Sequence, residues 1–104
     1  MLSPIVALQP HTTKASKMLG VRSSALPLRE QIESILAAGQ DATIDFSGVE
    51  ATQSFVDELI GVLVLAHGPS VLERVVFKGC SPTVKGILQF VVADRADQFM
   101  KAAH

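Results

Sequence analysis

A strand, a short polar turn and an apolar helix follow one another within residues 43–65, and this succession constrains the fold more than any other feature. Ile44 and Phe46 belong to a short apolar run that ends in a turn-forming cluster at Gly48. From Phe55 onward the apolar residues recur with helical rather than alternating spacing. The segment therefore predicts a buried strand whose end leads directly into a helix.

Two further segments are predicted strands. Residues 5–8 form a short apolar run, and Pro4 and Pro10 beside it restrict this run to the edge of a sheet. Residues 71–77 form a longer apolar run that predicts a buried strand. Strands thus alternate with helices along the chain, which favours an α/β fold: a single domain with a small mixed or parallel sheet and helices packed on it.

Two further helices are predicted, one on each side of the central one. The first follows Ser23 and Ser24 and runs to about Ala38, with Pro27 in its first turn, where the missing N–H costs nothing, and Gly39 as its end. The second begins with Ser81 as N-cap and Pro82 as its first residue. Its apolar residues have the spacing of a helix that lies on a sheet; they are Val84, Ile87, Leu88, Val91 and Val92.

The central helix, predicted for residues 54–67, is apolar on nearly every side. Its polar face is limited to Asp57, Glu58 and Gly61. A helix of this kind is covered either within its own domain or by a partner, and a two-layer domain has little room to enclose it. A homodimer or partner surface on this helix and burial within the domain therefore stand as equal alternatives.

Ser54 stands at the predicted start of this helix and is the main candidate functional residue. With Asp57 three residues later, it fits an N-cap whose hydroxyl accepts a hydrogen bond from a backbone N–H of the first turn. The junction between a strand end and a helix also faces solvent or a partner, so the same hydroxyl is available as a switch. Both interpretations stay open.

The residues around this junction resemble the STAS domain, the sulfate-transporter and anti-sigma-factor-antagonist module. They resemble more closely a bacterial STAS-like family with little functional characterisation. The similar stretches are residues 44–49, residues 53–59 and the strand-turn-helix of residues 74–92. The resemblance implies a non-enzymatic regulatory module that binds other proteins.

In anti-sigma-factor antagonists, a kinase-like ATPase phosphorylates a hydroxyl in the matching turn and thereby releases the complex. Ser54 falls on the phosphorylated position, so the resemblance implies a phosphorylation site there and a kinase-like ATPase or an anti-sigma-like factor as partner. A phosphate at this position would join Glu50, Asp57 and Glu58 in a strongly acidic patch. The implied partner-binding residues are Gln53, Ser54, Phe55, Asp57 and Glu58.

Composition and charge disfavour several other classes. The formal net charge is −1 and the basic residues are scattered, which leaves no basic patch for nucleic acid. The longest apolar run, residues 62–66, is far shorter than the roughly 18 residues of a membrane helix, and the first residues do not read as a targeting signal. The single cysteine, Cys80, fits a reduced compartment. We therefore expect a cytoplasmic protein that binds neither nucleic acid nor membrane.

The candidate reactive side chains show no spacing typical of a metal site, a phosphate loop or a nucleophile elbow. They are His11, His67, His104, Cys80, Asp45, Glu50, Asp57 and Glu58. Adjacent helical residues such as Asp57 and Glu58 point about 100° apart and do not converge on one substrate atom. His67 ends a predicted helix, where it interacts favourably with the helix dipole. We expect no enzymatic activity, no metal and no cofactor.

Two alternatives to a phosphorylation switch remain. The domain can be a constitutive dimerisation or scaffold unit in which Ser54 is only a helix cap. A nucleotide-binding role is a weaker alternative, because the sequence has no phosphate-binding loop.

Overall fold

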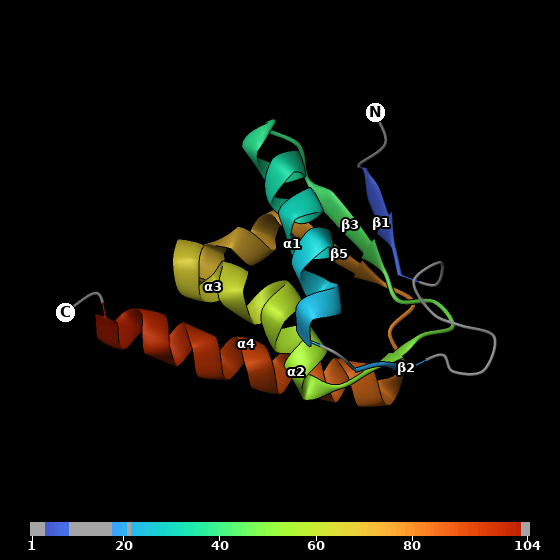
Figure 1. Ribbon diagram of the computed structural model, residues 1–104. Helices are drawn as coiled ribbons and strands as arrows, with labels where there is room; N and C mark the ends of the chain where they lie inside the picture. Colours follow the sequence, from blue (N-terminus) through green and yellow to red (C-terminus); the bar gives the residue numbers. More distant parts are fainter. Residues whose placement is uncertain (1–3, 9–17, 21, 103–104) are drawn as a thin grey trace.

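The computed structural model describes residues 4–8, 18–20 and 22–102, and in these residues three parallel strands carry helices on one side (Figure 1). The strands are β1 (Ile5–Ala7), β3 (Ala42–Asp45) and β5 (Val75–Lys78), and β3 lies in the middle. Helix α1 (Arg22–Ala37) lies between β1 and β3 along the chain. The predicted α/β fold is therefore confirmed, and so is the edge position of the first strand.

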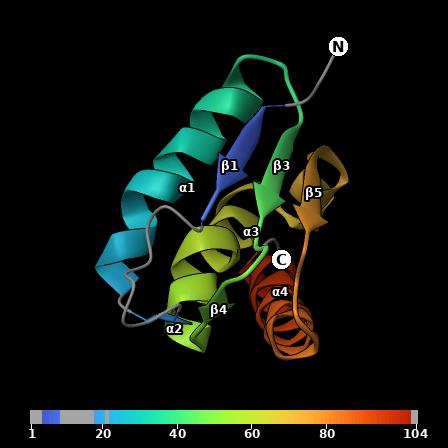
Figure 2. The same cartoon turned by 90° about the vertical axis from the view of Figure 1, so that its right-hand side faces the viewer.

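Side chains alternate between the two faces of the sheet. Ala42 and Ile44 of β3 are buried beneath the helices, whereas the intervening side chains are partly exposed. On the outer face the register places Ile5 and Val76 on either side of Thr43. Figure 2 shows this face toward the viewer, with α1 to the left of β1. The core therefore lies between the inner face of the sheet and the helices.

The prediction of a buried strand over residues 71–77 is wrong in its first half. Residues Pro69–Arg74 form a 3-10 helix, η3, and only Val75–Lys78 form strand β5. Gly68, with φ of +87°, turns the chain just before Pro69. Because β5 lies at a sheet edge with one face uncovered, only Val75 is buried and Val76 is about half exposed.

Helix α1 ends as the sequence predicts and begins earlier. Gly39 has φ of +81°, and the N–H groups of Gly39 and Gln40 donate to the carbonyls of Leu36 and Ile35, an arrangement typical of a helix that ends in glycine. The helix already includes Arg22, so Pro27 lies in the second turn rather than the first.

The central helix runs from Gln53 to His67 in three parts. They are α2 (Gln53–Val56), a π-helical turn η2 (Asp57–Gly61) and α3 (Val62–His67). This helix lies between α1 and α4 (Pro82–Ala102), and the π-helical turn contacts both. Its large apolar side chains are buried; they are Phe55, Val56, Leu59, Ile60, Leu63 and Val64. Of the two alternatives for this helix, the structure shows burial within the domain, because α1 and α4 flank it on the helical side of the sheet.

Helix α4 begins as predicted. The Ser81 hydroxyl accepts a hydrogen bond from the N–H of Val84 at 3.1 Å, and Pro82 is the first helical residue. Val84, Leu88 and Val91 are buried against the core. None of the helices in the described ranges is long and apolar enough to cross a membrane.

A small second pairing was not predicted. Strand β2 (Met18–Leu19) runs parallel to β4 (Glu50–Ala51), which directly precedes the central helix. The N–H of Thr52 continues this pairing by donating to the carbonyl of Leu19 at 2.9 Å. The start of α1 and the start of the central helix are therefore held close together.

Candidate functional site

The turn that follows β3 sets the direction of the chain into the candidate site. A carboxylate oxygen of Asp45 accepts a hydrogen bond from the N–H of Ser47 at 2.9 Å, and the hydrogen bonds from Ser47 lower the pKa of Asp45. Gly48 has φ of +72°, which suits glycine because it has no Cβ. Val49 then donates to the carbonyl of Phe46, which closes the turn.

Thr52, and not Ser54, is the N-cap of the central helix. Its backbone is extended, and its hydroxyl oxygen accepts a hydrogen bond from the N–H of Phe55 at 3.2 Å. The same hydroxyl donates to the carbonyl of Gly20 at 3.1 Å. The cap predicted at Ser54 is wrong because the N-cap lies two residues earlier, so that the helix begins at Gln53.

Ser54 is consequently an exposed residue of the first helical turn. It lines a polar surface hollow of about 350 Å³, which we call the Ser54 hollow. The hollow is formed by Arg22, Gln53, Ser54, Asp57, Asp94, Arg95 and Gln98. These residues come from the starts of α1 and of the central helix and from the second half of α4.

Asp57 forms the base of the Ser54 hollow and is the one charged residue that is buried in the described part of the chain. Arg95 holds both of its carboxylate oxygens, at 2.7 and 2.6 Å, and Arg22 donates to one of them at 2.9 Å. The pKa of Asp57 is lowered, chiefly by the hydrogen bonds from Arg95; burial opposes this shift, and Arg22 adds to it. The same interaction raises the pKa of Arg95.

The π-helical turn brings this cluster together. Asp57 and Gly61 lie at its two ends, and a Cβ on Gly61 would collide with the Asp57 carboxylate and come within 2.9 Å of Val91. Helix α4 can approach the central helix closely only because Gly61 has no side chain. Turns of this type are frequent at functional sites.

Glu58 faces α1 and is also paired. Its carboxylate lies 3.5 Å from Arg22 Nη1 and 3.9 Å from Arg29 Nη2. Arg29 in turn donates to Glu33 at 3.3 Å. Glu50 points elsewhere, because its carboxylate accepts the hydroxyl proton of Ser81 at 2.7 Å. The expected strongly acidic patch is therefore wrong: arginines neutralise two of its three carboxylates, and the third lies with Ser81.

The structure separates the five predicted partner-binding residues into two groups. Gln53 and Ser54 are exposed, and Glu58 is partly exposed. Phe55 is fully buried in the core, and Asp57 lines the Ser54 hollow with a side chain that is only 13% exposed and held by two arginines. The burial of Phe55 argues against it as a contact residue, and partner binding through the other four stays a prediction.

The family model described as "STAS-like domain of unknown function (DUF4325)" matches residues 24–85, which is more than half of the chain. The chain belongs to this STAS-like family. No curated protein and no solved structure matches it. The matched region includes β3, the turn, the central helix and β5, so the predicted resemblance is confirmed for the part of the chain that builds one wall of the Ser54 hollow.

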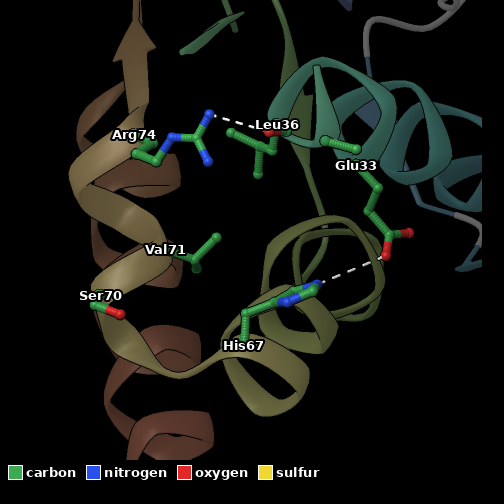
Figure 3. Close-up of a pocket in the computed structure, with 7 residues that line it drawn as sticks. Glu33, Leu36, His67, Ser70, Val71 and Arg74 are labelled. Atoms are coloured by element: carbon green, nitrogen blue, oxygen red, sulfur yellow. Dashed lines mark hydrogen bonds and ion pairs between the residues drawn. The ribbon is translucent and has the colours of Figure 1, made fainter. Parts of the chain in front are cut away.

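A second hollow of this STAS-like domain, of about 480 Å³, lies at the opposite end of α1 (Figure 3). His67, the last residue of α3 as predicted, points toward Glu33, with 3.9 Å between Nε2 and the carboxylate. Arg74 donates to the carbonyls of Leu36 and Gln40. Arg74 thereby satisfies the end of α1, and its guanidinium is engaged in a structural role.

The remaining candidate reactive residues of the STAS-like domain do not assemble into a site. Burial raises the pKa of the Cys80 thiol, with a smaller opposing effect from Lys85, so Cys80 is a poor thiolate nucleophile. His11 and His104 lie outside the described residues. Within the described ranges, no three His, Cys, Asp or Glu side chains are grouped so as to hold a metal ion.

Three residues of the charged cluster were missed from the sequence: Arg22, Arg29 and Arg95. The sequence does contain a pattern from which Arg95 could have been identified. It continues the buried stripe of α4 through Val84, Leu88 and Val91, and a charged residue on an apolar stripe needs a buried partner of opposite charge. Asp57, within an otherwise apolar helix, has the same requirement.

Proposed function

We propose that this STAS-like domain is a non-enzymatic regulatory module that binds a protein partner and is switched by phosphorylation of Ser54. The observation that carries the proposal is the position of the Ser54 hydroxyl. It is exposed at the Ser54 hollow, and no side-chain hydrogen bond among the described residues involves it. Because Thr52 caps the helix, a modification of Ser54 leaves the cap in place.

The geometry supports binding rather than catalysis. Asp57 is engaged by Arg95 and Arg22, and these ion pairs keep its carboxylate from acting as a base at neutral pH. Cys80 lies in a separate hollow beside Phe77 and has a raised pKa. Asp57 and Arg95 in the Ser54 hollow thus support the fold, while Gln53 and Ser54 are exposed and available to a partner.

The partner in this proposal is a kinase-like ATPase. The Ser54 hydroxyl oxygen attacks the γ-phosphorus of ATP, the bond to ADP breaks, and the hydroxyl proton passes to a base of the partner. The phosphate adds about −1.5 to −2 charges to a surface that carries two arginines and two aspartates in the Ser54 hollow. This change in charge weakens contacts with the partner. Because the reaction needs ATP, the proposal places the protein in the cytoplasm.

The test is affinity capture from the native cells with the tagged protein and three variants. Ser54→Asp introduces a negative charge, Ser54→Ala removes the hydroxyl, and Ser34→Asp places the same charge on an exposed serine of α1. The proposal expects the wild type, Ser54→Ala and Ser34→Asp to retain the same ATPase partner, and Ser54→Asp to lose most of it.

The same material reports whether Ser54 is modified. Cleavage after Glu50 and Glu58 releases residues 51–58, in which Thr52 and Ser54 are the only hydroxyl residues. A phosphate on Ser54 in part of the material is expected. Retention of the ATPase partner by Ser54→Asp would reject the switch. Capture of only a second copy of this chain, with Ser54 unmodified, would reject it in favour of a constitutive dimer.

A further inference from the structure

Arg22 has hydrogen-bond donors to spare at the Ser54 hollow. In the described part of the chain, its hydrogen bonds to Asp57 and Glu58 use Nη1 alone, at 2.9 and 3.5 Å. A guanidinium has five N–H donors, so those on Nε and Nη2 are not used in these bonds. The Arg22 side chain is 47% exposed, so these donors are accessible at the surface.

In Arg95, the other arginine of the Ser54 hollow, each of the three guanidinium nitrogens already donates a hydrogen bond. Its Nε and Nη2 hold Asp57, and its Nη1 donates to the Gln98 side chain at 3.2 Å. Its side chain is 22% exposed. Of the two arginines, Arg22 is therefore the one whose donors are more accessible to a new anion in the Ser54 hollow.

Ser54 lies on the same side of the central helix as the arginine cluster. It precedes Asp57 by three residues, and residues three apart lie on one face of a helix. Ser54, Asp57 and Arg22 all line the Ser54 hollow. A phosphate on Ser54 therefore stands next to the guanidinium that already contacts Asp57.

We infer that Arg22 binds the phosphate of phosphorylated Ser54 within the same molecule, through its Nε and Nη2 donors, while Arg95 keeps Asp57 in place. The inference rests on the phosphorylation proposed above and specifies how the phosphate acts. Arginine suits this role because its planar fork matches the oxygens of a phosphate.

This contact would transmit the modification to α1. Arg22 is the first residue of α1 and follows β2, which pairs with β4 directly before Thr52. A phosphate held by Arg22 ties the start of α1 to the start of the central helix and covers the arginine that a partner would otherwise meet. Phosphorylation then changes two surface groups together, the Ser54 hydroxyl and the Arg22 guanidinium.

The experiment measures the second pKa of the phosphate by phosphorus NMR on full-length protein that carries phosphoserine at position 54. The ordinary value is about 6. A neighbouring guanidinium stabilises the dianion, so we expect a pKa about one unit lower in the folded protein than in the same protein unfolded in urea. Arg22→Gln should abolish this difference, and Arg22→Lys should keep part of it.

Lys78→Gln is the matched control, because it removes one positive charge from the exposed end of β5 and should leave the phosphate pKa unchanged. Equal pKa values in folded and unfolded wild type would overturn the inference, as would a lowered pKa that persists in Arg22→Gln. If Arg22→Gln fails to fold, the phosphate pKa values of folded wild type and folded Arg22→Lys still test the inference. Partner release by Ser54→Asp is measured separately. A negative result for the Arg22 contact therefore does not reject the proposed phosphorylation switch.

Discussion

Arg95 and Asp57 form a bidentate ion pair that joins α4 to the π-helical turn of the central helix. The two N–H···O distances are 2.7 and 2.6 Å, and the side chains are 22% and 13% exposed. Arg22 contributes a third hydrogen bond from the start of α1. One carboxylate thus connects three helices next to the residue that we propose as the switch.

Asp57→Asn should destabilise the protein by about 2 kcal/mol. Breaking a fully buried ion pair costs about 3 to 5 kcal/mol, and the partial exposure of both arginines reduces this cost. Asp97→Asn is the control, because it makes the same change in an exposed pair with Lys101 and should cost much less stability than Asp57→Asn. Urea unfolding measures both free energies, and equal losses would show that the Asp57 cluster has no special role.

The contribution of Asp57 should also depend on pH in one direction. Folding lowers its pKa, so between the folded and the unfolded pKa the unfolded chain binds more protons. The stabilisation is fully present well above pH about 3.9 and is lost as the pH falls through the lowered pKa. The difference in unfolding free energy between wild type and Asp57→Asn should therefore be large at pH 7 and shrink as the pH falls below the unfolded pKa of about 3.9. A difference that stays constant over this range would contradict the assignment.

The elements that could be predicted from the sequence are those with a strong local signal. Gly39 and the Ser81-Pro82 pair marked the end of α1 and the start of α4, because backbone conformation at these positions depends on few residues. The apolar stripe of α4 was equally clear. The 3-10 helix before β5 was missed because a short apolar run has the same appearance in a strand and in a buried helical turn.

The candidate site depended on contacts between distant residues, and these were harder to predict. Ser54 was identified through its position at a helix start, whereas its role as cap was assigned to the wrong hydroxyl, because Thr52 and Ser54 are both suitable caps. The pairs of Asp57 with Arg22 and Arg95 span 35 and 38 residues. No local pattern specifies such pairs, although each charge on an apolar stripe indicated that a partner exists.

Thr52→Ala and Ser54→Ala should differ clearly in stability. Thr52 caps the helix and donates to the carbonyl of Gly20, so its replacement should cost about 1 kcal/mol or more. Ser54 is exposed, and its replacement should change the free energy of unfolding by less than about 0.5 kcal/mol. Thermal or urea unfolding of the two variants tests this, and a larger loss for Ser54→Ala would restore Ser54 as the cap.

Gly61→Ala should destabilise the protein although alanine favours helices more than glycine does. The new Cβ would collide with the Asp57 carboxylate and come within 2.9 Å of Val91, and overpacking of this kind costs about 1 to 3 kcal/mol. Gly86→Ala in α4 is the matched control, since its Cβ would meet no atom within 4 Å and the helix should gain about 0.5 to 1 kcal/mol. Opposite signs in urea unfolding are expected. If both variants were stabilised, the close approach of α4 to the π-helical turn, and with it the buried geometry of Asp57 and Arg95, would be incorrect.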